Sequence, residues 1–126
     1  MLTRRTTLAL LASTALTPTL AAAESHLPAV QEMTIGNPDA AVTVVEYASF
    51  TCPHCRTFHE RVWPSLKENY VDTGKINFVY REVYFDRYGL WAGMLARCDG
   101  GEKYFGIADM LYKRQREWVD QQDIDY

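Results

Sequence analysis

A strand-like segment that leads directly into a cysteine-bearing helix constrains the fold of this chain more than any other feature. Residues 41–48 (AVTVVEYA) are nearly continuous in β-branched and apolar side chains, which is typical of a strand covered on both faces, as in a parallel sheet. Pro53 suits the first position of a helix, where its missing N–H costs nothing, so Cys52 is predicted at the N-cap. The chain is therefore expected to build an α/β fold around this strand–helix junction.

The helix after Pro53 and the segments around it complete this unit. Apolar side chains at spacings of three and four predict one buried stripe, made of Cys55, Phe58, Val62, Leu66 and Tyr70. Pro64 is expected to kink the helix, and Gly74 to end it. A loosely alternating segment, 76–83, predicts a second strand, so the two strands should be parallel with a right-handed crossover. Residues 31–35 predict a short edge strand.

The chain beyond Tyr88 is predicted to be helical. One helix is marked by Trp91, Met94, Leu95 and Cys98 and ends at Gly100-Gly101; a second is marked by Tyr104, Ile107, Ala108 and Leu111. We expect the aromatic and methionine side chains from Trp91 to Trp118 to pack between helices, and Cys98 to be buried and inert.

The N-terminal residues 1–23 have the three-part pattern of a secretory signal. Arg4 and Arg5 precede an apolar segment, and an A-x-A cleavage site ends at Ala23. The paired arginines leave both the general secretory and the twin-arginine export routes open. Cleavage would leave residues 24–126 in a compartment where disulfides persist, so the cysteines are interpreted as disulfide chemistry first.

The overall charge excludes some classes of protein. With 13 Lys and Arg against 16 Asp and Glu, the formal net charge is −3, which argues against a protein that neutralises nucleic-acid phosphates. No apolar run reaches the roughly 18 residues that a membrane-spanning helix needs. We therefore expect a small globular protein without nucleic-acid partners and without membrane insertion of the mature chain.

The two cysteines of the motif Cys52-Pro53-His54-Cys55 are expected to have different chemistry. A Cys52 thiolate at the N-cap could accept hydrogen bonds from the backbone N–H groups of His54 and Cys55, and the helix dipole favours its negative charge. The imidazole of His54 would stabilise the thiolate further. Cys55 lies on the apolar stripe and should be buried, so Cys52 is predicted to be the attacked sulfur and Cys55 the resolving one. Because a stabilised thiolate favours the reduced form, the disulfide should be a strong oxidant.

The segment VTVVEYASFTCPHC resembles the DsbA family of periplasmic thiol-disulfide oxidoreductases, and the resemblance extends over residues 30–120. It implies a thioredoxin-like fold, with a βαβ part at 24–86 that holds the active site and the start of an inserted helical domain at 87–126. It also implies that Glu46 is a buried acid beneath the disulfide, which accepts or relays the proton of Cys55. Reduced exported proteins would be the substrates, an inner-membrane partner would reoxidise the enzyme, and no cofactor or metal is expected.

The resemblance also implies that part of the fold lies outside this sequence. Proteins of the family have a later β-hairpin, preceded by a cis-proline that contacts the active-site disulfide, whereas no proline follows Pro64 here. We therefore expect the chain to be the N-terminal part of a longer protein or a truncated product. The edge of strand 41–48 would then be bare, which favours aggregation and low stability. A second disulfide in the helical domain, as in several relatives, would pair Cys98 with a cysteine beyond Tyr126.

Other interpretations of the same residues stay open at this point. Cys52 and Cys55 could form a purely structural disulfide, or bind zinc together with His59 and Cys98. His59 is interpreted as a helix-surface residue, and His54 could be a solvated histidine. Glu46 could face water on an edge strand. A periplasmic reductase or isomerase, an inactive fragment and a metal-binding module are the alternative functions.

Overall fold

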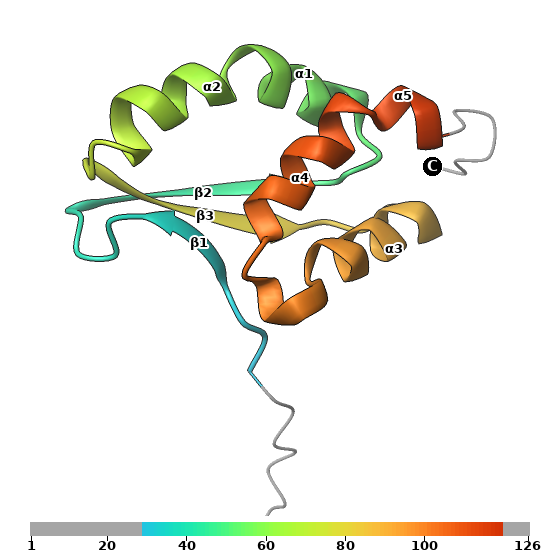
Figure 1. Ribbon diagram of the computed structural model, residues 1–126, viewed down its shortest axis with the longest axis horizontal. Coiled ribbons are helices and arrows are strands. Elements are labelled where there is room, and N and C mark those ends of the chain that lie inside the picture. Colours follow the sequence, from blue (N-terminus) through green and yellow to red (C-terminus); the bar gives the residue numbers. More distant parts are fainter. Residues whose placement is uncertain (1–28, 120–126) are drawn as a thin grey trace, which may run out of the picture.

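The computed structural model describes residues 29–119 of the chain (Figure 1). Its sheet has three strands, β1 (Met33–Gly36), β2 (Val42–Ala48) and β3 (Ile76–Glu82), in the order β1-β3-β2. β3 pairs antiparallel with β1 and parallel with β2, where Val44 lies opposite Phe78. The predicted βαβ unit and short edge strand are confirmed. The predicted signal, residues 1–23, lies outside the described residues.

The crossover between β2 and β3 is helical but broken. It consists of α1 (Pro53–Arg61), α2 (Trp63–Leu66) and a π-helical turn, η1 (Lys67–Val71). The interruption at Val62 lies two residues before Pro64, where the expected kink occurs. Of the predicted stripe, Cys55, Phe58 and Leu66 pack against the core. The stripe is wrong at Val62, where the helix is interrupted, and at Tyr70, in the π-helical turn, because both side chains are about half exposed (49% and 48%). The buried side chains of this crossover are His59, Trp63 and Val71.

Between β3 and residue 119, the structure has four further helical segments. They are α3 (Arg87–Ala96), a 3₁₀ turn, η2 (Cys98–Gly101), α4 (Tyr104–Lys113) and α5 (Gln115–Trp118). The carboxylate of Asp86 caps α3 by accepting a hydrogen bond from the backbone N–H of Gly89 at 2.8 Å. The first of the two predicted helices, α3, ends at Ala96, earlier than predicted, because the backbone leaves the α-helical region at Arg97 (φ −87°, ψ 1°) and is left-handed at Asp99 (φ 64°). The second predicted helix is confirmed, with Tyr104, Ala108 and Leu111 buried.

The face that α3 buries is the opposite of the predicted one. Its small residues Gly89, Ala92, Gly93 and Ala96 are buried, whereas Trp91, Met94 and Leu95 are between 50% and 62% exposed. Small residues let the helix approach its neighbours closely, and a Cβ on Gly93 would stand 2.9 Å from the ring of Tyr84. The spacing of large apolar residues marks one face of a helix but does not show what covers that face, so the prediction that these side chains pack between helices is wrong for Trp91, Met94 and Leu95.

An aromatic core joins the sheet to the helices. Phe50 stacks on Tyr80 with ring centroids 5.5 Å apart, and Trp63 contacts Phe78 at 4.5 Å. In Figure 1, α1 and α2 run along one side of the sheet, and α4 contacts both α1 and α3. This core therefore fixes the beginning of α1, where the cysteine motif lies, against both the sheet and the later helices.

Only one face of β2 is covered in the part of the chain that the structure describes. Val44, Glu46 and Ala48 point toward the helices, while Val45 and Tyr47 on the other face are 39% and 63% exposed. The prediction that both faces are covered is wrong for these residues, because an apolar composition does not show which elements will cover a strand. Within residues 29–119, no helix is long and apolar enough to cross a membrane.

Candidate active site

The loop that follows β2 places Cys52 at the start of α1. Cys52 has an extended backbone (φ −72°, ψ 122°) and forms the N-cap, with Pro53 in the first turn, as predicted. Its carbonyl accepts the first hydrogen bond of the helix, from the N–H of Arg56 at 3.1 Å. The first-turn N–H groups and the positive end of the helix dipole therefore lie next to Cys52.

The two motif cysteines are free thiols that contact each other. Both are half-buried, and a hydrogen bond joins the side chains of Cys52 and Cys55. The Cys52 side chain makes no capping hydrogen bond, so the predicted bonds from the N–H groups of His54 and Cys55 are absent from this reduced state. A protonated thiol is a weak acceptor, and here it interacts with the neighbouring thiol instead.

Cys55 is the thiol that retains its proton. It was predicted to be buried on the helix stripe and is half-buried against the core. Burial raises the pKa of the Cys55 thiol from 9.0 to about 11; the side chain of Cys52 and the charge of Glu46 raise it further, and a backbone hydrogen bond from Ser49 opposes them. At neutral pH, Cys55 is therefore protonated and a poor nucleophile.

The raised pKa of Cys55 predicts a pH dependence of stability in the reduced protein. Between about pH 9 and pH 11 the folded chain holds a proton that the unfolded chain has lost, so stability should fall as the pH rises through this range. We expect urea midpoints measured from pH 8 to pH 11 to fall further for the reduced wild type than for Cys55→Ala. The variant is the appropriate control because it retains Tyr80, Tyr104 and Tyr112, whose pKa values burial also raises. Parallel midpoint curves would contradict the assignment.

Glu46 lies close enough to Cys55 for its charge to act on that thiol, and it is hydrogen-bonded to a histidine. Its carboxylate oxygens accept hydrogen bonds from Nε2 of His59 at 3.2 and 3.1 Å, and the two side chains are only 13% and 5% exposed. The idea that Glu46 faces water on an edge strand is therefore wrong. The interpretation of His59 as a surface residue is also wrong: it follows Cys55 by four residues, so both lie on the inward face of α1.

Tyr112 connects this acidic pair to the rest of the site. Its ring stacks on His59 with centroids 4.1 Å apart, and its hydroxyl lies 2.5 Å from that of Tyr80. The same hydroxyl donates to the carbonyl of Ser49, just before the cysteine motif, at 3.2 Å. Sequence reasoning did not identify Tyr112 because its position in α4 marks it only as an apolar helix residue.

A second residue beside the cysteine motif that the sequence did not indicate is Gln115 in α5. It is 1% exposed, and its side-chain amide donates to the carbonyls of Phe50 and Cys52 at 2.7 and 3.0 Å. It lies in a charged stretch that indicates a solvated helix face, so no local signal distinguishes it. His54, in contrast, is exposed in the first turn of α1, open to any molecule that approaches the cysteines.

Cys98 lies away from this site and is exposed, so the prediction of a buried cysteine is wrong. It lies in η2, beyond the end of α3, and its sulfur donates only to the carbonyl of Met94 at 3.5 Å. Among residues 29–119, no group of three or more His, Cys, Asp and Glu side chains could hold a metal ion. The zinc alternative, which needs Cys98 next to Cys52, Cys55 and His59, therefore finds no assembled site in this part of the chain.

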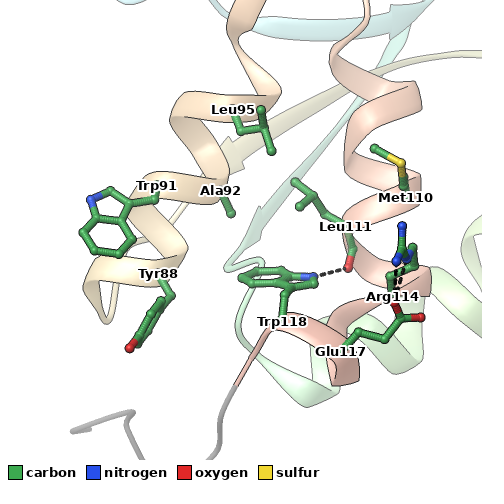
Figure 2. A pocket seen from close by; sticks show the side chains of 9 residues that line it. All are labelled: Tyr88, Trp91, Ala92, Leu95, Met110, Leu111, Arg114, Glu117 and Trp118. Carbon is green, nitrogen blue, oxygen red and sulfur yellow. Dashed lines mark hydrogen bonds and ion pairs between the residues drawn. The ribbon is translucent and has the colours of Figure 1, made fainter.

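An apolar groove with a volume of about 460 Å³ lies between α3 and the α4–α5 pair. Figure 2 shows Ala92 and Leu95 on one wall facing Leu111 and Trp118 on the other. The indole N–H of Trp118 donates to the carbonyl of Leu111 at 3.0 Å, which fixes α5 against α4. Neither Cys52 nor Cys55 lines this groove.

A thioredoxin-like βαβ unit with a C-x-x-C pair at the beginning of its helix is typical of the thiol-disulfide oxidoreductases. The chain matches the thioredoxin family over residues 29–125. It is 43% identical over 88 residues to a Rickettsia bellii protein named as a protein-disulfide oxidoreductase, an alignment that covers 69% of this chain and 34% of that protein. It is also 28% identical over 93 residues to disulfide bond formation protein D of Bacillus subtilis, covering 68% and 42% of the two chains.

Solved structures give the same result. Wolbachia pipientis alpha-DsbA1 superposes with a TM-score of 0.69 at 36% identity, covering 79% of this chain and 50% of that one. A protein-disulfide isomerase from Novosphingobium aromaticivorans superposes with a TM-score of 0.66 at 26% identity, covering 75% and 48%. The chain belongs to the thioredoxin family, among its DsbA-like disulfide oxidoreductases, and the DsbA-like fold inferred from the sequence is confirmed. It spans about a third of the Rickettsia relative and half of the Wolbachia chain.

Proposed function

We propose that this chain catalyses the formation of disulfides in other proteins by exchange at a Cys52–Cys55 disulfide. The observation that carries the proposal is the asymmetry of the pair: Cys52 lies at the N-cap of α1, whereas burial holds the proton on Cys55. A sulfur at a helix N-terminus is favoured as a thiolate, hence as a leaving group and as the site of attack.

The proposed reaction transfers two electrons from the substrate to the enzyme in two steps. A substrate thiolate attacks Cys52, the Cys52–Cys55 bond breaks, and a mixed disulfide forms between the substrate and Cys52. Cys55 leaves as a thiolate and takes up a proton from solvent, which the carboxyl group of Glu46, held by His59, relays to it. A second substrate thiolate then attacks the substrate sulfur of the mixed disulfide, which releases oxidised substrate and a Cys52 thiolate.

The setting that we propose is the periplasm. The pattern of residues 1–23 supports export, and the disulfide chemistry requires an oxidising compartment. The substrates would be reduced exported proteins, and an inner-membrane partner would restore the disulfide after each turnover. Within this proposal, residues 24–86 carry the site and residues 87–126 belong to a helical insertion.

The redox potential of the Cys52–Cys55 couple tests this proposal directly. Because a stabilised Cys52 thiolate favours the reduced form, we expect equilibration with glutathione buffers to give a potential above about −200 mV. The matched variant His54→Ala should be more reducing, since it removes the imidazole next to Cys52 and leaves the helix start intact. A wild-type value near that of thioredoxin, about −270 mV, would favour the reductase alternative and contradict the oxidase.

The same experiment separates the remaining alternatives. A couple of intermediate potential that reshuffles scrambled disulfides would favour an isomerase, the name given to the Novosphingobium neighbour. A chain that forms no Cys52–Cys55 disulfide under oxidising conditions would be an inactive fragment.

A further inference from the structure

The loop from Ser49 to Cys52, which ends at the proposed nucleophile, is hydrogen-bonded mainly by residues of the later helices. Tyr112 of α4 donates to the carbonyl of Ser49, and the hydroxyl of Thr51 donates to Asp86, the cap of α3, at 2.5 Å. Gln115 of α5 donates to the carbonyls of Phe50 and Cys52. Each of the four residues from Ser49 to Cys52 is therefore hydrogen-bonded to a side chain of the segment after β3, Thr51 through its hydroxyl and the other three through their carbonyls.

Gln115 makes the two bonds that lie closest to the nucleophile. Its amide nitrogen carries two hydrogens, which can satisfy two carbonyls at once. Buried carbonyls without a donor are costly, and Gln115 at 1% exposure has lost its own water, so these bonds strongly favour one arrangement of the loop.

The bond to Cys52 has a particular consequence. The Cys52 carbonyl also accepts the first hydrogen bond of α1, from Arg56, so its peptide plane is held from two directions. This plane determines how the N-cap residue is oriented relative to the first-turn N–H groups. Gln115 therefore fixes the geometry on which stabilisation of a Cys52 thiolate depends.

We propose that Gln115 is a positioning residue for Cys52, through which α5 sets the reactivity and redox equilibrium of the cysteine pair. This inference rests on the proposed exchange at Cys52. The first-turn N–H groups interact with the Cys52 sulfur most strongly when it is a thiolate, so loosening its orientation penalises the reduced form more than the disulfide. By linkage, if a substitution lowers the unfolding free energy of the two redox forms by different amounts, the free energy of the redox equilibrium changes by that same difference.

The test compares Gln115→Met, which keeps length and removes both donors, with Trp118→Phe. The control removes a hydrogen bond from the same helix, α5, that goes to Leu111 of α4 and makes no contact with the loop before Cys52. We expect Gln115→Met to slow alkylation of Cys52 by iodoacetamide at pH 7 by about fivefold, the scale of one hydrogen bond, and to make the couple more reducing by a similar factor. Trp118→Phe should lower the unfolding midpoint and change neither quantity by more than about twofold.

A loss of stability without a change in the reactivity of Cys52 or in the redox equilibrium would identify Gln115 as purely structural. If Gln115→Met lowers the stability of the oxidised and reduced forms equally, with alkylation rate and redox equilibrium within about twofold of wild type, the proposal is overturned. Should this variant fail to unfold cooperatively, Gln115→Asn is measured against the same thresholds, since its shorter amide cannot reach both carbonyls. Because alkylation does not require turnover, it tests Gln115 even if the wild-type chain proves inactive in exchange.

Discussion

Cys52→Ser is expected to reduce disulfide exchange to the uncatalysed rate, whereas Cys55→Ser is expected to trap a mixed disulfide with the substrate. Serine at the N-cap preserves the helix start but offers no sulfur for attack. In Cys55→Ser, oxidised glutathione in the refolding buffer converts the thiol at position 52 to a mixed disulfide, and a substrate thiolate then displaces glutathione from it. Cys55, which could attack Cys52 and free the substrate again, is no longer present, so the adduct accumulates. Opposite outcomes from two similar substitutions would follow from the different roles of the two cysteines.

This prediction is measured by refolding of a reduced test protein and by mass spectrometry of the covalent adducts. Cys98→Ser is the matched control: its cysteine is exposed and far from the motif, so exchange should continue at the wild-type rate. Adducts on position 55 in Cys52→Ser, formed as fast as those of wild type, would reverse the assignment of the nucleophile.

His59→Leu is expected to destabilise the protein by about 1–3 kcal/mol, because it leaves the Glu46 carboxylate in a largely buried position without its hydrogen-bond donor. The loss of the ring that stacks on Tyr112 contributes to the same effect. The variant should also slow release of Cys55 in the first exchange step, since the carboxylate that relays its proton is no longer held in place. Urea unfolding and stopped-flow thiol exchange measure the two effects separately.

A double-mutant cycle isolates the pair. Glu46→Gln removes the charge and keeps an acceptor, so Glu46→Gln combined with His59→Leu should be less destabilised than the sum of the single variants. Strict additivity would mean that the 3.1 Å contact contributes nothing beyond the packing of the two side chains.

Much of the fold and the core of the site follow from local rules. Pro53 can occupy only the beginning of a helix without loss, and the β-branched segment before it favours a strand, so the βαβ unit and the N-cap position of Cys52 were predictable. Which face of each helix is buried was less predictable. The exposure of Trp91 and Met94 and the burial of His59 depend on which elements pack against each helix, and residue spacing does not contain that information.

The sequence by itself determined the groups that the proposed exchange reaction uses, because two cysteines around Pro53-His54 and an acid six residues before Cys52 are local features of one strand and one helix. Only the tertiary structure decided how that chemistry is held. His59 reaches Glu46 across 13 residues of sequence, and Gln115 reaches Cys52 across 63. Such contacts form only when the chain folds these elements together, and the distant side chains then supply donors to the buried carbonyls and carboxylate.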